Sequence, residues 1–327
     1  MQIGITGASG HVGNVLCRLL LEQGHTVNAL YHSDDTALQN LNVNLFQGSV
    51  LESDSLIPFI SGCDVVINSA AIISIHGDPA GIVFKTNTEG PTNILAASIN
   101  AGVKKIIHLS STHAVLEEPL YQPFEENRPY KTANNFAYDY SKATGEQIML
   151  EAFRKNKIEG CVVRPSSVIG LFDYKPSEIG KALIDFYNRK IPMLPPGGYN
   201  FIDVRDISQS IINSIEKGRN GEVYLLSGDY YTLKEFAGIV TKASGVKTPQ
   251  KVMPFWFLKG ILPFVKLYGK LKKAAPIFTI EAITALKLGH PNMIHEKAKT
   301  ELNHTCRPLE ETIRDFYDWK KKRGIIQ

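Results

Sequence analysis

Three glycines at regular spacing stand near the start of this chain: Gly7, Gly10 and Gly13. The apolar residues 3–5 precede them, and residues 15–21 follow with helical periodicity. Gly7 permits a tight turn, Gly10 lets the backbone approach a pyrophosphate, and Gly13 lets a helix pack on a strand. The helix N-terminus then offers unpaired N–H groups to phosphate. A strand, a glycine turn and a helix in this order predict a dinucleotide-binding site.

The composition is that of a globular chain. The 327 residues are 43% hydrophobic, which is enough to fill a sizeable core. The net charge of +4 gives no reason to expect nucleic-acid binding. The four cysteines form no Cys-x-x-Cys motif, so a reduced, cytoplasmic location and no metal site are expected.

Targeting and membrane segments are not expected. The first strand begins at the start of the chain, which leaves no room for a signal peptide. No stretch reaches the roughly 20 apolar residues that cross a bilayer. Residues 253–267 are interpreted as a helix pair over an apolar pocket, with peripheral membrane contact as the alternative.

The first half of the chain alternates strand-like and helix-like runs. This alternation predicts an α/β, Rossmann-type doubly wound parallel sheet. Strands are expected at 3–6, 26–31, 44–47, 65–68, 105–110 and 160–164, and helices at 13–23, 53–60, 91–101 and 138–156. Residues 1–170, with a returning strand near 221–228, are expected to form the dinucleotide-binding domain. Residues 171–327, with helices at 233–243 and 309–322, are expected to form a smaller α+β region that shapes a substrate pocket.

A hydroxyl-rich strand end and a Tyr-x-x-x-Lys spacing form a second group of candidate site residues. Ser111 and Thr112 close a buried strand, and Tyr138 and Lys142 follow on one face of a helix. A nearby ammonium lowers the pKa of a tyrosine from its reference of about 10, so such a pair can exchange a proton near neutral pH. The same spacing occurs elsewhere in this chain, so Tyr138 is singled out by its place after the hydroxyl-rich strand.

Together these motifs resemble those of extended short-chain dehydrogenases/reductases, the NAD-dependent epimerase/dehydratase superfamily. The resemblance is carried by residues 6–13, Ala70-Ala71, Asn87-Thr88-Glu89-Gly90, 109–115, 138–146, Arg164-Pro165, Val204-Arg205-Asp206 and Asp318-Trp319. The pattern is most similar to that of dihydroflavonol 4-reductases, bacterial aldehyde/ketone reductases and 3β-hydroxysteroid dehydrogenases.

The resemblance implies roles for individual residues. Tyr138 would be the catalytic acid/base, and Lys142 would lower its pKa and hold the nicotinamide ribose. Thr112 or Ser111 would bind the substrate oxygen. Epimerases and dehydratases usually have this hydroxyl residue at the position of Thr112, and dihydroflavonol reductases have it at the position of Ser111. We prefer Thr112. The implied cofactor-binding residues are Gly7, Ser9, Gly10, His11, Val12, Gly13, Tyr31, His32, Ser33, Ser49, Val50, Ala70, Ala71, Asn87, Tyr138, Lys142, Pro165 and Val168. The implied substrate contacts are Ile73, His113, Phe136 and Ser167.

The end of the second strand bears on the choice of cofactor. Tyr31 stands where NAD-specific members carry Asp or Glu, and His32 and Ser33 follow it. This favours NADP, whereas the nearby Asp34 and Asp35 argue for NAD as the alternative, since a rearranged loop could bring one of them to the ribose.

The resemblance implies reduction of a ketone or aldehyde, or the reverse oxidation, on a small, fairly apolar substrate. A nucleotide-sugar epimerase or dehydratase is the alternative, but those enzymes usually have Arg where Tyr199 and Asn200 stand here. A non-catalytic NADP-binding sensor or scaffold is a second alternative, disfavoured because Tyr138 and Lys142 are both present. A homodimer is expected by the same resemblance.

Overall fold

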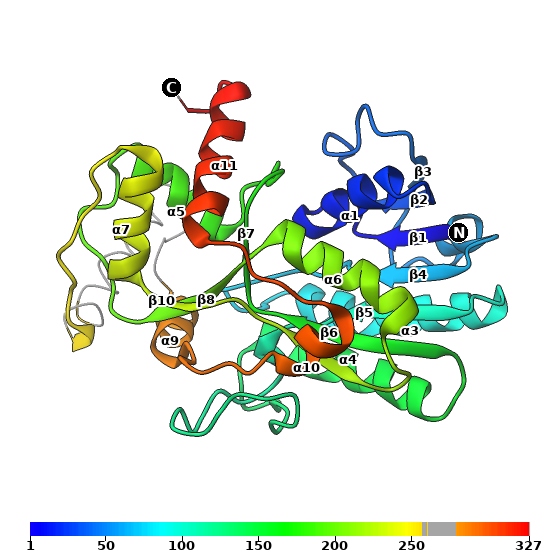
Figure 1. Cartoon of the computed structure of the whole chain (residues 1–327). Coiled ribbons are helices and arrows are strands. Elements are labelled where there is room, and N and C mark those ends of the chain that lie inside the picture. The colour runs from blue at the N-terminus through cyan, green and yellow to red at the C-terminus, as the bar shows by residue number, and fades with distance from the viewer. Residues whose placement is uncertain (257–259, 261–278, 327) are drawn as a thin grey trace.

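A parallel seven-stranded sheet forms the centre of this computed structural model, which describes residues 1–256, 260 and 279–326 (Figure 1). Its strand order is β3-β2-β1-β4-β5-β6-β9, and every neighbouring pair is parallel. The strands are β1 (Gln2–Thr6), β2 (Thr26–Tyr31), β3 (Asn44–Gln47), β4 (Val65–Asn68), β5 (Lys105–Leu109), β6 (Glu159–Pro165) and β9 (Val223–Leu226). This order is that of a doubly wound dinucleotide-binding fold.

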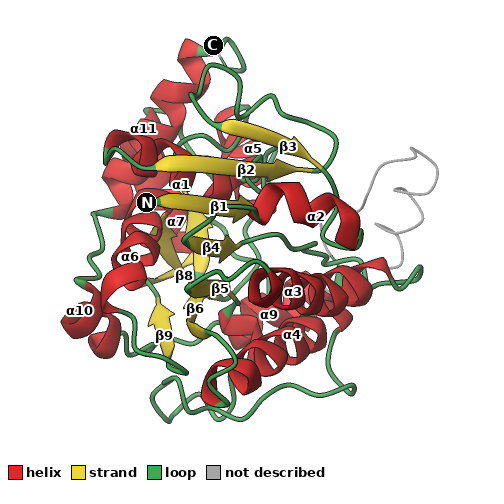
Figure 2. Ribbon diagram, turned by 90° about the vertical axis from the view of Figure 1, so that its right-hand side faces the viewer, coloured by secondary structure: helices red, strands yellow, loops and turns green. Residues whose placement is uncertain are grey.

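Helices cover both faces of the sheet. Figure 2 shows α2, α3 and α4 on one side and α1 and α6 on the other. An apolar core lies on each face of the sheet, and alternate residues of β4 point into one or the other. Val65 and Ile67 pack with α1 and α6, whereas Val66 packs with α2, α3 and α4. The helices are α1 (His11–Glu22), α2 (Ser53–Ile60), α3 (Ile82–Asn100), α4 (Ala137–Arg154), α5 (Glu178–Tyr187), α6 (Val204–Lys217), α7 (Leu233–Ser244), α9 (Ile280–Leu288), α10 (Glu296–Leu302) and α11 (Leu309–Lys322).

A second, three-stranded sheet follows in the C-terminal half. It has the order β10-β8-β7, with β7 at Ser167–Ile169, β8 at Gly198–Asp203 and β10 at Tyr230–Thr232. A separate apolar cluster joins it to α5, α7 and α11, and the rings of Phe201 and Phe236 stack there at 4.5 Å. The chain then returns to the main sheet through α6 as well as β9, so the returning segment is longer than the single strand expected at 221–228.

The main-sheet strands lie within about a residue of their expected positions, but α3 corrects the sequence prediction. It begins at Ile82, not at residue 91, and continues through Pro91. Proline cannot donate to the carbonyl of Asn87. That carbonyl instead lies against Gly145 of α4, where a Cβ would clash with it. Close packing of α3 against α4 therefore accommodates Pro91 within the helix, although the local sequence predicts a helix start there.

Residues 257–259 and 261–267 of the expected apolar helix pair lie outside the described residues. Within the described part of the chain, no helix has the length and apolar character needed to traverse a bilayer.

Candidate active site

The glycine turn joins β1 to α1 in the geometry that a phosphate site needs. Gly7 has φ 64°, and its carbonyl oxygen accepts a 2.9 Å hydrogen bond from the Gly10 N–H. A Cβ at Gly13 would clash with that same carbonyl, so only glycine lets α1 approach so closely. The backbone N–H groups at the start of α1 are thus brought to the carboxyl end of the sheet.

Thr6 ties this turn to the loop after β4. Its hydroxyl accepts hydrogen bonds from the N–H groups of Ser69 (3.1 Å) and Ala70 (3.0 Å) and donates to Asn68 Oδ1 (2.8 Å). A Cβ at Gly7 would lie 2.9 Å from the Cα of Ala70. The two loops that flank the expected pyrophosphate therefore hold each other in place.

The end of β2 carries no carboxylate at its last position. Tyr31 is half-buried, and His32 and Ser33 are exposed. Asp34 accepts hydrogen bonds from Thr36, which lower the pKa of its carboxyl to about 2, and it also forms a 3.1 Å ion pair with Lys175.

The catalytic tyrosine candidate is protonated at neutral pH. Burial raises the pKa of Tyr138 to about 12, although a hydrogen bond with Ser111 opposes the shift. Lys142 lies one turn further along α4 and donates a 2.8 Å hydrogen bond from Nζ to the carbonyl of Leu109. Burial lowers the pKa of Lys142 to about 8. The motif predicts a tyrosine with a lowered pKa, so the direction found here is a correction, caused by desolvation.

Replacement of Lys142 by methionine is expected to raise the free energy of unfolding at pH 7 by about 1–3 kcal/mol, because folding buries this ammonium. The folded pKa of about 8 lies below the reference 10.5, so the destabilisation by Lys142 is full below pH 8 and disappears as pH rises to 10.5. Urea unfolding of both proteins at several pH values checks this. A variant less stable at pH 7, or a pH-independent difference, would contradict it.

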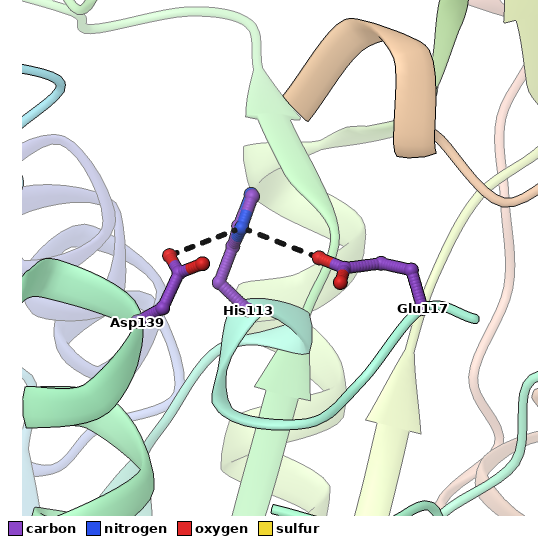
Figure 3. A group of neighbouring side chains, drawn as sticks. All are labelled: His113, Glu117 and Asp139. Atoms are coloured by element: carbon purple, nitrogen blue, oxygen red, sulfur yellow. Dashed lines mark ion pairs between the residues drawn. The ribbon is translucent and has the colours of Figure 1, made fainter. Parts of the chain in front are cut away.

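A charged cluster lies beside Tyr138. Figure 3 shows His113 standing between Asp139 and Glu117, and its Nδ1 lies 3.4 Å and 3.8 Å from their carboxylate oxygens. Lys131 is buried behind them, with Nζ 2.7 Å from Glu117 and 2.6 Å from Asp139. Burial opposes ionisation of Asp139, but His113 and Lys131 hold its pKa below the usual value. The Lys131 ammonium supplies the positive charge that a metal ion would bring to this set of ligands.

A small cavity of about 30 Å³ opens next to this cluster. Most of its lining side chains are polar, and they come from the loop after β5, the segment after β6, β8 and the region around α9. The lining residues are Thr112, His113, Glu117, Ser166, Ser167, Tyr199, Asn200, Ala285, Leu288, Gly289, His290 and Met293. Among the residues expected from the sequence, it brings together Thr112, His113 and Ser167.

Other expected contacts lie apart from this cavity. Ile73 is 72% exposed, and Phe136 is the half-buried residue before α4. Asn87 is buried and bonds to the backbone of Ile72 and to Ser141, so its amide ties α3 to the loop after β4 and to α4.

The remaining expected cofactor residues lie around the carboxyl end of the sheet. His11 bonds through Nε2 to the carbonyl of Leu171 at 2.7 Å. The Ser49 hydroxyl accepts a hydrogen bond from the Leu51 N–H. Val50 is buried against Gly90, and a Cβ added at Gly90 would lie 2.8 Å from Cγ2 of Val50. Pro165 ends β6, and Val168 lies in β7.

Sequence reasoning did not single out Ser166, Asn200, His290 and Met293 as lining residues, although His290 and Met293 lie in the region expected to shape a substrate pocket. They come from segments far apart in the chain, and no spacing in the sequence links them to Tyr138. For Asn200 the sequence did offer one indication, because it lies where nucleotide-sugar epimerases and dehydratases usually have Arg.

Comparisons with known proteins agree with this geometry. The model of the NAD dependent epimerase/dehydratase family matches residues 3–227. "Sterol demethylase protein B" of Methylococcus capsulatus is 27% identical over 331 residues, which cover 98% of this chain and 99% of that protein. A 4-hydroxy-2-methyl-3-oxo-4-farnesyl-3,4-dihydroquinoline-1-oxide ketoreductase of Stigmatella aurantiaca is 29% identical over 263 residues, 78% of this chain and 77% of that protein.

Among solved structures, the crystal structure of gox2253 superposes with a TM-score of 0.86 and 28% identity over 99% of both chains. The family model covers well over half of the chain, including the glycine turn, Tyr138 and Lys142. The chain therefore belongs to the NAD dependent epimerase/dehydratase family and is an NAD(P)-dependent enzyme of the extended short-chain dehydrogenase/reductase type.

Proposed function

We propose that this enzyme reduces a ketone or aldehyde on a small, fairly apolar substrate, with NADPH as the preferred coenzyme. The observation that carries the proposal is the placement of Tyr138, whose buried phenol hydrogen-bonds Ser111 and lies one helical turn before Lys142 on α4. A phenol in this place can donate the proton that carbonyl reduction consumes at the carbonyl oxygen. A ketoreductase among the relatives that match over most of the chain supports the same reaction class.

The residues present fit a dinucleotide. A side chain at Gly7 or Gly13 would collide with neighbouring backbone, so the turn leaves its N–H groups accessible at the start of α1. These residues would hold the pyrophosphate, residues 31–33 the adenosine ribose, and Pro165 and Val168 would flank the nicotinamide. The coenzyme would supply the hydride.

The protein's own residues would supply the proton and hold the substrate. Tyr138 would donate its phenolic proton to the carbonyl oxygen as the new C–H bond forms. Because Ser111 forms a hydrogen bond with Tyr138, we propose that Ser111, and not Thr112, also binds the substrate carbonyl oxygen. Thr112 lines the neighbouring cavity. Lys142, one turn away, would stabilise the resulting phenolate in its charged form.

The preference for NADPH rests on the end of β2. No carboxylate ends this strand, and of Asp34 and Asp35, which follow it, Asp34 is already engaged by Thr36 and Lys175. Arg18 of α1 donates from Nη2 to the Tyr174 hydroxyl at 3.2 Å and to the carbonyl of Ala37 at 3.5 Å, and its guanidinium lies over the ring of Phe172. His32 and Ser33 are exposed at the end of β2, and together with Arg18 they would supply the donors that an additional 2′-phosphate needs.

Incubation of the full chain with aromatic ketones, aldehydes and flavanonols, in the presence of NADPH or NADH, tests the proposal. We expect absorbance loss from the reduced nicotinamide, with kcat/KM at least about tenfold higher for NADPH, since one charge-assisted contact contributes about 1.4 kcal/mol or more. Interconversion of a UDP-hexose without carbonyl reduction would instead favour the epimerase alternative. An equal or greater kcat/KM with NADH would overturn the coenzyme preference.

A further inference from the structure

A lysine from the C-terminal half of the chain reaches the loop after β2. Lys175 lies between β7 and α5, and its Nζ forms a 3.1 Å ion pair with Asp34. Asp34 stands three residues after Tyr31, the last residue of β2. In dinucleotide-binding folds the end of this strand meets the adenosine ribose, where a 2′-phosphate distinguishes NADP from NAD. The ammonium of Lys175 therefore lies at the point on which the choice of coenzyme depends.

Side chains of α1 and α11 fix the backbone that leads to Lys175. Three successive carbonyl oxygens, at positions 171–173, each accept a hydrogen bond from one of these helices. The donors are His11 (2.7 Å), Asn14 (3.2 Å) and Lys320 (2.9 Å). His11 and Asn14 begin α1, directly after the glycine turn. The segment is therefore held against the coenzyme-binding turn before any coenzyme arrives, so a contact from Lys175 would cost little conformational entropy of the backbone.

The two basic side chains that reach this loop differ in how far they are already engaged. Arg18 is half-buried, and its guanidinium lies 4.2 Å from the centre of the Phe172 ring. The same guanidinium donates to the Tyr174 hydroxyl. The Lys175 side chain is 64% exposed, and among the described residues Asp34 is the polar partner of its ammonium. Because an ammonium has three donors, Lys175 can bind a phosphate at the surface without giving up a buried contact.

The charges of this loop make the lysine decisive for a phosphate. Asp34 and Asp35 contribute two carboxylates, and among the described residues Arg18 and Lys175 are the Arg and Lys side chains that contact the loop. A 2′-phosphate would add about 1.5–2 negative charges at pH 7. Without Lys175 this phosphate would face an unpaired Asp34. The uncharged ribose hydroxyls of NADH can instead donate to that carboxylate, so loss of the lysine would favour NADH.

We propose that Lys175 binds the 2′-phosphate of NADPH, so that a residue from beyond β7 completes the coenzyme site and determines the choice of coenzyme. This inference rests on the coenzyme preference proposed above and names the side chain on which that preference depends. Asp34 acts as a positioning residue, because its carboxylate holds the Lys175 ammonium beside the end of β2.

The test measures binding without turnover. Adenosine 2′,5′-bisphosphate and adenosine 5′-monophosphate differ only by the 2′-phosphate, so the ratio of their calorimetric Kd values for the full chain isolates that group. The wild type is expected to bind the bisphosphate at least about tenfold more tightly, the effect of one charge-assisted contact. Lys175→Met keeps the apolar stem and removes the ammonium. It should lower the ratio at least about fivefold, while Kd for the monophosphate stays within about twofold of wild type.

Lys181→Met is the matched control. The Lys181 side chain is 57% exposed and pairs with Glu178 inside α5, so its removal takes away the same charge from a similar exposed ion pair. Its ratio should stay within about twofold of wild type. The kcat/KM values for NADPH and NADH should follow the same order, with the preference for NADPH lowered in Lys175→Met and kept in Lys181→Met.

Asp34→Asn separates phosphate binding from neutralisation of a carboxylate. If Lys175 contacts the phosphate, adding Lys175→Met to Asp34→Asn should still lower the ratio at least about threefold. If Lys175 only neutralises Asp34, the second substitution would change nothing once that charge is gone, and the assignment would be wrong.

The outcomes separate the two proposals. A wild type that prefers the bisphosphate, with a ratio unchanged in Lys175→Met, overturns the role of Lys175 and leaves the preference for NADPH standing. A wild type that binds both probes equally overturns the preference for NADPH and the role of Lys175 with it. Because Lys175 is exposed, its variant is expected to fold as the wild type does, and urea unfolding verifies this.

Discussion

Replacement of Tyr138 by phenylalanine is expected to lower kcat for carbonyl reduction by about 10²–10⁴-fold, the range that a positioned general acid contributes. The variant keeps the ring that packs beside His113 and removes only the hydroxyl that donates the proton. The neighbouring Ser111 hydroxyl is a far weaker acid and cannot replace it. Coenzyme affinity should stay within about twofold, because the glycine turn supplies the pyrophosphate contacts. Steady-state kinetics and calorimetric coenzyme titration measure the two quantities.

Tyr140→Phe is the matched control. Tyr140 lies two residues further along the same helix, and its ring stacks on that of Phe84 at 5.1 Å, a contact that phenylalanine preserves. Its kcat should therefore remain within about twofold of wild type. If Tyr138→Phe retained most of its activity while Tyr140→Phe lost it, Tyr138 would not be the proton donor.

The sequence predicted most of the main sheet because its inner strands are short, mainly apolar runs between turn residues, and burial on both faces of the sheet demands that pattern. The second sheet was less accessible. Its strand β7 contains only Ser167–Ile169, and β10 pairs with β8 through Tyr230 and Asn200 without local periodicity. The start of α3 was mispredicted because Pro91 is locally a helix-start residue, whereas contact with Gly145 on another helix decides its actual position.

The active-site candidates divide in the same way. The glycine turn and the Tyr138–Lys142 spacing depend on neighbours in the chain, so they could be identified from the sequence. The electrostatic state of Tyr138 depends on burial, which a motif does not encode, and burial moves its pKa upward. Asn200 of β8 shares a cavity with Thr112 and His113 only because the fold places β8, the loop after β5 and the region around α9 together, which no spacing in the sequence predicts.

Arg164→Met is expected to reduce the free energy of unfolding by about 3–5 kcal/mol, the usual effect of removing one partner from a buried ion pair. Arg164 is 1% exposed, and its Nε donates to Glu146 Oε2 at 3.0 Å. Glu146 is fully buried on α4, one turn after Lys142, and Tyr130 donates to it at 2.8 Å. Without the guanidinium, this buried carboxylate would lose its ion-pair partner, and the ammonium of Lys142 one turn away would be its remaining nearby positive charge. Urea unfolding followed by circular dichroism measures the loss.

A double variant shows whether charge or hydrogen bonding is responsible. Arg164→Met with Glu146→Leu removes both charges and keeps comparable apolar volume, so its stability should return to within about 1–2 kcal/mol of wild type. A double variant as unstable as Arg164→Met alone would mean that the lost contacts to Glu126 O and Tyr130 matter more than the unpaired charge. Recovery would show instead that the ion pair under α4 is replaceable, and that what the catalytic helix requires there is neutrality.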